Sequence, residues 1–190
     1  MISFHPNGSV FEVQSGYLVC PVNTVGRMGA GLAKDFASRV PQLELRYRAE
    51  CVSGALELVD DPVAPEGLRA SCGIYMDPSP ETHLMPGLDA LWRANPNWNP
   101  YVGRIIACLP TKRHWRAPSE LRFVRAAVRD FVEFLRSKNL VHGRPLIPIA
   151  VPMLGCGLGG LDWRDVRPIL LEEFDLLRFF YEIRIYGAPA

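Results

Sequence analysis

Two glycine-rich segments are the parts of this sequence that point most directly to a bound ligand. They are VNTVGRMGAG, residues 22–31, and PMLGCGLGG, residues 152–160. Each follows an apolar run typical of a buried strand and precedes a segment with helical periodicity. In open α/β sheets ligands bind beyond the carboxyl ends of strands, where glycines let backbone amides approach a phosphate. The first and second glycine segments together therefore predict a site for the diphosphate of a nucleotide.

Neither glycine segment matches the two best-known phosphate motifs. The GxxxxGK[ST] pattern of P-loop proteins is absent, and GRMGAG lacks the spacing of the Rossmann fingerprint. A tight turn with no ligand is the alternative explanation for either segment alone.

One lysine lies where it could react with a sugar. Lys112 follows the apolar run 104–110 and is flanked by Arg113, His114 and Arg116. Neighbouring cations and partial burial both lower the pKa of a lysine. The neutral amine could attack the anomeric carbon of a ribose or act as a base, whereas the alternative is a solvated loop lysine.

The residues around Lys112 could contact the group to which the sugar is attached. His114 and Trp115 are expected to line that side, and Trp115 could stack on a base or instead pack on the following helix. Arg113 and Arg116 could meet nucleic-acid phosphates or remain solvated.

Cysteine and histidine usage predicts no metal site and no disulfide framework. The five cysteines are scattered with no CxxC pair, and no histidines show ligand spacing. This usage is typical of a reducing, cytoplasmic location. No signal peptide is evident, and no apolar run approaches the roughly 20 residues of a membrane span, so no membrane partner is expected.

The elements that position these residues alternate along the chain. A length of 190 residues with 21 Lys+Arg and 20 Asp+Glu fits one domain, 1–190, without an overall basic surface. The patterns predict helices at 32–40, 42–54, 119–140 and 162–177, the last two capped by Ser119 and Asp162, and strands at 1–4, 17–23, 55–60, 69–76, 104–110, 145–154 and 181–187. The alternation favours an α/β fold with helices on both faces of a mixed sheet. Residues 77–103 are expected to form an insertion or lid.

Three blocks of the sequence resemble the macrodomain superfamily, and within it the DarG-like branch. They are VNTVGRMGAGLAKDF, LPTKRHWRAPSEL and PMLGCGLGGLDWRDV, in that order. The resemblance implies a three-layer α/β/α sandwich that binds ADP-ribose and hydrolyses its bond to an acceptor, thymidine in single-stranded DNA, without a cofactor. It implies Lys112 as the active-site lysine and Asn23 as the residue that orients the distal ribose. The expected ligand-binding residues are Gly29, Ala30, Gly31, Thr111, His114, Trp115, Gly155, Cys156, Gly157, Leu158, Gly159, Gly160 and Tyr186.

The chain departs from the family pattern at two positions. Ser9 stands where many macrodomains carry an aspartate that holds the adenine amine, so adenine recognition would use backbone groups, with Tyr186 stacking. Gly159 stands where the human terminal ADP-ribose glycohydrolase carries an aspartate, as in DarG-like sequences. The sequence ends soon after its last strand, so a stoichiometric toxin trap is not expected.

Three other functions remain open from the sequence. They are a reader that binds ADP-ribose without turnover, a phosphatase or deacylase acting on ADP-ribose 1″-phosphate or related esters, and a macrodomain whose insertion serves protein contacts.

Overall fold

The main sheet is mixed and has six strands. The computed structural model describes residues 1–40, 42–76, 104–138 and 146–189, so residues 77–103 and the histidines at 83 and 142 lie outside the described part. The strand order is β1-β8-β7-β2-β6-β5, and all neighbours run parallel except β5 and β6. The strands are β1 (Ile2–His5), β2 (Gly16–Asn23), β5 (Gly73–Met76), β6 (Arg104–Lys112), β7 (Ile147–Pro152) and β8 (Tyr181–Tyr186).

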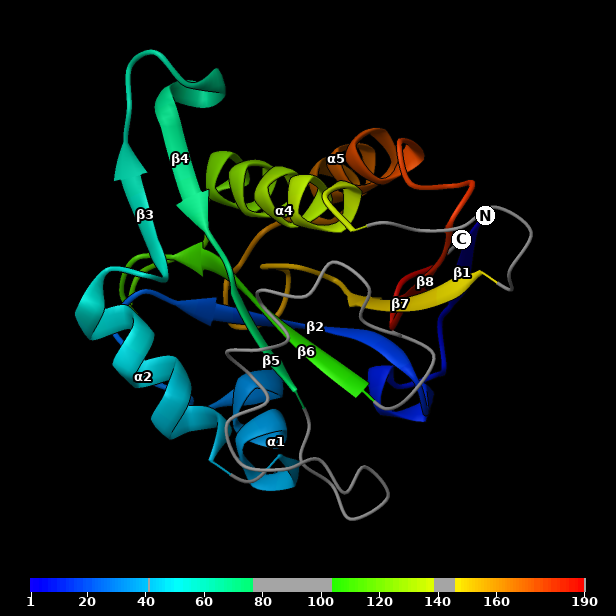
Figure 1. Ribbon diagram of the computed structural model, residues 1–190, viewed down its shortest axis with the longest axis horizontal. Helices are drawn as coiled ribbons and strands as arrows, with labels where there is room; N and C mark the ends of the chain where they lie inside the picture. The colour runs from blue at the N-terminus through cyan, green and yellow to red at the C-terminus, as the bar shows by residue number, and fades with distance from the viewer. Residues whose placement is uncertain (41, 77–103, 139–145, 190) are drawn as a thin grey trace.

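Helices cover both faces of this sheet. Figure 1 shows α1 and α2 on one face and α4 and α5 on the other. Short 3₁₀ turns, Val10–Glu12 and Pro65–Gly67, precede β2 and β4 (Leu68–Ser71). The helices are α1 (Gly31–Arg39), α2 (Leu43–Ser53), α4 (Leu121–Arg136) and α5 (Trp163–Asp175). The predicted three-layer α/β/α arrangement is confirmed. Among the described residues, none of the helices has the length and hydropathy that a bilayer crossing requires.

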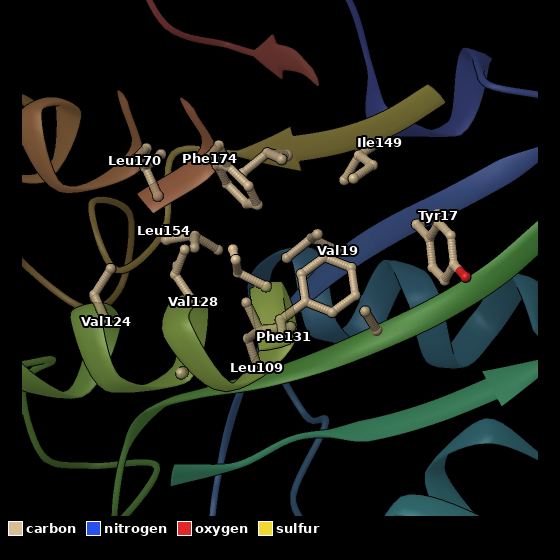
Figure 2. Close-up of a cluster of buried hydrophobic side chains, with 14 of the residues drawn as sticks. Tyr17, Val19, Leu109, Val124, Val128, Phe131, Ile149, Leu154, Leu170 and Phe174 are labelled. Atoms are coloured by element: carbon tan, nitrogen blue, oxygen red, sulfur yellow. The ribbon is translucent and has the colours of Figure 1, made fainter. Parts of the chain in front are cut away.

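Strand β2 is buried on both faces because alternate residues enter separate hydrophobic clusters. Tyr17 and Val19 pack toward α4 and α5, as Figure 2 shows, next to Phe131 and Phe174. The residues between them, including Leu18, belong to the cluster beneath α1 and α2. Because both faces of β2 are buried, the position and direction of the strand in the sheet are fixed. Asn23, its polar last residue, is therefore held in a fixed place at the carboxyl end of the strand.

The predicted strand 69–76 is two strands. Residues Leu68–Ser71 form β4, which pairs antiparallel with β3 (Glu57–Asp60) in a separate hairpin, whereas β5 joins the edge of the main sheet. Cys72 lies between them. Its backbone N–H donates to Asp130 Oδ2 at 2.9 Å and its thiol donates to the carbonyl of Ala127 at 3.2 Å. These hydrogen bonds to α4 interrupt the strand at Cys72. Because Asp130 and Ala127 lie far along the chain from Cys72, the sequence around Cys72 does not indicate the interruption.

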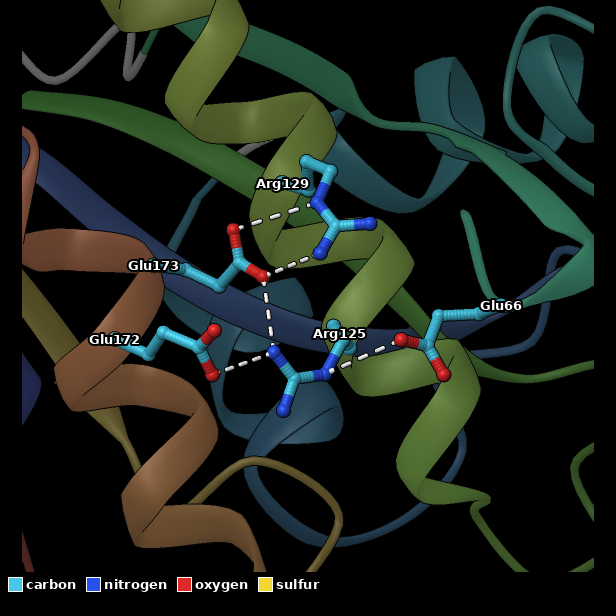
Figure 3. A network of polar contacts seen from close by, with 5 residues as sticks. All are labelled: Glu66, Arg125, Arg129, Glu172 and Glu173. Atoms are coloured by element: carbon cyan, nitrogen blue, oxygen red, sulfur yellow. Dashed lines mark hydrogen bonds and ion pairs between the residues drawn. The ribbon is translucent and has the colours of Figure 1, made fainter. Parts of the chain in front are cut away.

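An ion network ties α4 to α5 (Figure 3). The carboxylate of Glu173, which is 7% exposed, accepts from Arg125 Nη1 at 3.2 Å and from Arg129 Nη2 at 2.8 Å. Arg125 also donates to Glu172 at 2.7 Å and lies 3.6 Å from Glu66. Glu173 is thus a buried acceptor shared by two guanidinium groups.

Glu173→Gln is expected to lower the free energy of unfolding by about 1–3 kcal/mol, because it leaves two partly buried guanidinium groups short of a charge. Glu172→Gln is the matched control, since that carboxylate is 66% exposed and contributes no more than about 0.5–1 kcal/mol. Urea unfolding of both variants measures the difference. Equal losses would contradict the structural role given to Glu173.

Candidate active site

A cavity of about 940 Å³ opens at the carboxyl ends of β2, β6 and β7. It brings together most of the residues singled out from the sequence. These are Asn23, Gly29, Ala30, Gly31, Thr111, Lys112, Trp115, Gly155, Cys156, Gly157, Leu158, Gly159 and Tyr186.

Two of the expected ligand-binding residues are not among those that line the cavity. His114 turns back within its own loop, where its Nδ1 accepts the backbone N–H of Arg116 at 3.2 Å. Gly160 closes a turn by donating its N–H to the carbonyl of Gly157 at 3.0 Å. Both residues shape loops next to the cavity.

A β-bulge sets Lys112 beside Asn23. Val22 pairs with Pro110, but the next pair along the two strands is Asn23 with Lys112, so Thr111 is an extra residue in β6. Bulges of this kind re-aim the side chains that follow them. The lysine was expected in a loop after the strand, whereas it is the last residue of β6. The bulge therefore makes the two proposed active-site residues neighbours across the sheet.

The Lys112 amine is partly withdrawn from solvent. Its Nζ donates to the carbonyl of Leu158, in the second glycine segment, at 3.2 Å. Burial lowers the pKa of Lys112 below its ordinary value of 10.5. The neighbouring cation Arg113 turns away and pairs with Asp60 at 2.7 Å. The expected lowering of the pKa therefore comes from burial.

The Asn23 side chain is 6% exposed and holds the first glycine segment in shape. Its Oδ1 accepts the backbone N–H of Val25 at 3.0 Å and that of Arg27 at 3.4 Å. Its Nδ2 donates to the carbonyl of Arg27 at 2.7 Å. The backbone N–H and the hydroxyl of Thr24 donate to the carbonyl of Arg113, which ties this segment to the lysine-bearing strand end.

The first glycine segment leads into the N-terminus of α1. Ala30 is the N-cap in an extended conformation, and no side chain caps the helix. In the described part of the chain, the N–H groups of Gly31, Leu32 and Ala33 have no hydrogen-bond partner, as at most helix starts. All three residues line the cavity. They offer it the positive end of a helix dipole.

The second glycine segment wraps around Ser119. The hydroxyl of Ser119 donates to Thr111 Oγ1 at 3.2 Å, and its backbone N–H donates to the carbonyl of Gly159 at 2.9 Å. Ser119 was predicted to cap the following helix, but α4 begins at Leu121 with Glu120 as N-cap. Ser119 is instead buried between β6 and the second glycine segment, and it forms hydrogen bonds to both.

Three consecutive amides of the second glycine segment are free to meet a ligand. In the described residues, the N–H groups of Gly157, Leu158 and Gly159 have no partner. Gly155 has a φ of +73°, a backbone conformation that glycine adopts without strain. The turn that it makes brings the three amides to the edge of the cavity.

Tyr186, the last residue of β8, also lines the cavity. One face of its ring stacks on His5, with the ring centroids 5.0 Å apart. Ser9, where the family resemblance implied a departure from an aspartate, does not line the cavity. Its hydroxyl accepts the N–H of Phe11, and its own N–H donates to Glu12 Oε1 at 2.8 Å. Ser9 therefore closes a turn and presents no carboxylate to the cavity.

Two side chains that line the cavity differ in how they can meet a ligand. Burial raises the pKa of the Cys156 thiol to about 11, so it stays protonated at neutral pH. Trp115 is 47% exposed at the cavity edge, with the Arg116 guanidinium 4.4 Å from its ring centroid. About half of Trp115 is therefore exposed at the edge of the cavity.

Sequence reasoning missed several residues that line the cavity. Arg27 and Leu32 lie in and just after the first glycine segment, and proximity to that segment was the available signal. Met153 had the same signal, since it lies in the second glycine segment. Ser119 had no comparable signal, because its place depends on how β6 and the second glycine segment pack together.

Comparisons with known proteins agree with this geometry. The DNA ADP-ribosyl glycohydrolase of Mycobacterium tuberculosis is 30% identical over 171 residues, which are 90% of this chain and 38% of that protein. The macrodomain of Mycobacterium tuberculosis DarG has a TM-score of 0.71 at 28% identity and covers 100% of this chain and 99% of its own. The structure of Thermosipho africanus DarTG in complex with ADP-ribose has a TM-score of 0.68 at 27% identity, over 97% of this chain and 41% of that one.

The comparisons also have two limits. No protein-family model matches the chain. The chain spans less than half the length of the curated relatives that it matches.

The mixed six-stranded sheet between two helical layers, with glycine segments after β2 and β7, defines the class of this protein, which is the macrodomain. Within that superfamily the chain is similar in sequence and structure to DarG macrodomains.

Proposed function

We propose that this macrodomain is a hydrolase that removes ADP-ribose from DNA, with Lys112 as its nucleophile. The observation that carries the proposal is the pairing of Lys112 with Asn23 between two segments of free backbone amides. If those amides bind the diphosphate of ADP-ribose, its distal ribose would lie next to the Lys112 amine. A curated relative named DNA ADP-ribosyl glycohydrolase supports the same activity.

The cavity suits a nucleoside diphosphate sugar. The cavity is lined in one part by the start of α1, which follows β2, and in another by the amides of Gly157, Leu158 and Gly159, which follow β7. Backbone donors and a helix N-terminus are well suited to phosphoryl oxygens. The complex of Thermosipho africanus DarTG with ADP-ribose supports this choice of ligand.

The proposed reaction has two steps. In the first, the neutral Lys112 amine forms a bond to the anomeric carbon of the distal ribose, and the bond from that carbon to the acceptor nitrogen breaks. The acceptor nitrogen takes the electron pair and the proton that the lysine nitrogen loses on forming its new bond. In the second, water adds to the same carbon, which frees the amine and releases ADP-ribose. Because burial lowers the pKa of Lys112, a larger fraction of the amine is neutral and able to begin the first step than in a solvated lysine.

Trp115 indicates the class of acceptor. Its exposed ring lies at the cavity edge with Arg116 stacked on it. An aromatic face next to a guanidinium fits a base and its phosphate in a single strand. We propose thymidine in single-stranded DNA as the acceptor.

One experiment separates this proposal from the alternatives. The protein is incubated with ADP-ribosylated single-stranded DNA, with an ADP-ribosylated protein and with free ADP-ribose, and released ADP-ribose is measured. Release from DNA alone is the expected result. Binding of ADP-ribose without release would identify a reader, and release from protein alone would move the acceptor to a side chain.

Trp115→Ala is expected to raise the KM for the DNA substrate about 5- to 100-fold, because stacking of one base contributes about 1–3 kcal/mol. Trp115→Phe, which keeps an aromatic face, should retain most of the affinity. The Kd for free ADP-ribose, measured by calorimetry, should not change in either variant. Equal weakening of DNA substrate and free ADP-ribose would place Trp115 on the nucleotide side instead.

A further inference from the structure

A tyrosine on α2 contacts the proposed ribose-orienting residue from behind. Tyr47 is completely buried in the cluster beneath α1 and α2. Its hydroxyl donates to the backbone carbonyl of Asn23 and lies 3.1 Å from Asn23 Oδ1. Tyr47 does not line the cavity, so any influence on a ligand passes through Asn23.

These bonds settle which way the Asn23 carboxamide faces. Its Oδ1 accepts the backbone N–H groups of Val25 and Arg27, and it lies close enough to the Tyr47 hydroxyl to share the single hydrogen that this hydroxyl gives to the Asn23 carbonyl. A carboxamide turned by 180° would point its NH₂ group at the two backbone N–H donors, so this orientation is excluded. One of the two Nδ2 hydrogens is already given to Arg27. The second Nδ2 hydrogen is what remains for a ligand.

We infer that Tyr47 is a positioning residue, which locks the Asn23 side chain so that it meets the distal ribose only as a hydrogen-bond donor. This inference rests on the proposed function, because it assumes that the ribose lies beside Asn23 and Lys112. A donor at that place holds a ribose oxygen and fixes the angle at which the anomeric carbon faces the Lys112 amine.

The hydroxyl of Tyr47 keeps this role across the working pH range. Burial raises the pKa of Tyr47 far above its ordinary value. The group therefore remains a proton donor at any pH where the protein is folded. The dependence of the rate on pH then reports on Lys112 and not on Tyr47.

Tyr47→Phe removes the hydroxyl and keeps the buried ring. Tyr75→Phe is the matched control, because Tyr75 is also buried in the same cluster and its hydroxyl bonds to Glu50 on α2 at 2.7 Å, away from Asn23. With ADP-ribosylated DNA as substrate, Tyr47→Phe is expected to lower kcat about tenfold and to leave KM within about threefold. Tyr75→Phe should leave both unchanged once the rates are corrected for the folded fraction. Tyr47→Phe with the kcat of the control would overturn the inference.

A second readout keeps the test independent of turnover. In a ¹⁵N-labelled protein, the side-chain amide protons of Asn23 should exchange with solvent at least about tenfold faster in Tyr47→Phe than in the wild type or in Tyr75→Phe. Unchanged exchange would overturn the lock. A wild type that releases no ADP-ribose would refute the proposed function instead, and the exchange rates would still decide whether Tyr47 fixes Asn23.

Discussion

Lys112→Ala is expected to reduce the release of ADP-ribose from DNA by about 10³-fold or more, since it removes the proposed nucleophile. The binding of free ADP-ribose should persist, because the diphosphate is assigned to backbone amides of the two glycine segments. Single-turnover assays and calorimetry on the same preparation measure the two effects. Lys34→Ala is the matched control, since Lys34 is an exposed lysine on α1.

The pH dependence of the wild type is the second part of this prediction. Protonation removes the lone pair, so the rate should rise with pH and level off once the amine is mostly neutral. Because burial lowers the pKa of Lys112, the midpoint of this rise is expected below the ordinary lysine value of 10.5. Lys112→Arg stays charged and should be as inactive as Lys112→Ala at every pH. A variant at position 112 with wild-type turnover would exclude the lysine mechanism.

The layers of this fold could be predicted because their cause is local. The apolar run of β2 is continuous, which is typical of a strand covered on both faces, and the structure places helices on both. Asp162 caps α5 as predicted, and its carboxylate accepts the N–H of Arg164 at 2.8 Å. Such features depend on residues a few positions apart.

What could not be predicted depends on residues far apart in the chain. Cys72 breaks a strand because it bonds to Asp130 and Ala127 on α4. The bulge at Thr111 appears only when β6 is aligned with β2. Tyr47 is indistinguishable from any other buried helix residue until Asn23 is placed against it.

Two glycines of the second glycine segment differ in whether contacts with other residues require them to be glycine. A Cβ on Gly159 would lie 2.3 Å from both the carbonyl oxygen of Gly155 and the hydroxyl of Ser119. A Cβ on Gly157 would meet nothing within 4 Å. Gly159 is therefore required by the packing of the segment, whereas Gly157 leaves open space beside free amides.

Gly159→Ala is expected to destabilise the protein by about 1–3 kcal/mol, because a backbone carbonyl and a bracketing serine must both shift. Gly157→Ala should change the stability by less than about 0.5 kcal/mol but weaken ADP-ribose binding at least about tenfold, a loss of about 1.4 kcal/mol. Thermal unfolding and calorimetry on both variants separate the two roles. The Gly157 variant tests whether the diphosphate lies beside the second glycine segment. A methyl group that does not lower the stability can weaken binding only if the ligand occupies the space that the methyl group fills. Full affinity in Gly157→Ala would mean that the diphosphate lies elsewhere in the cavity.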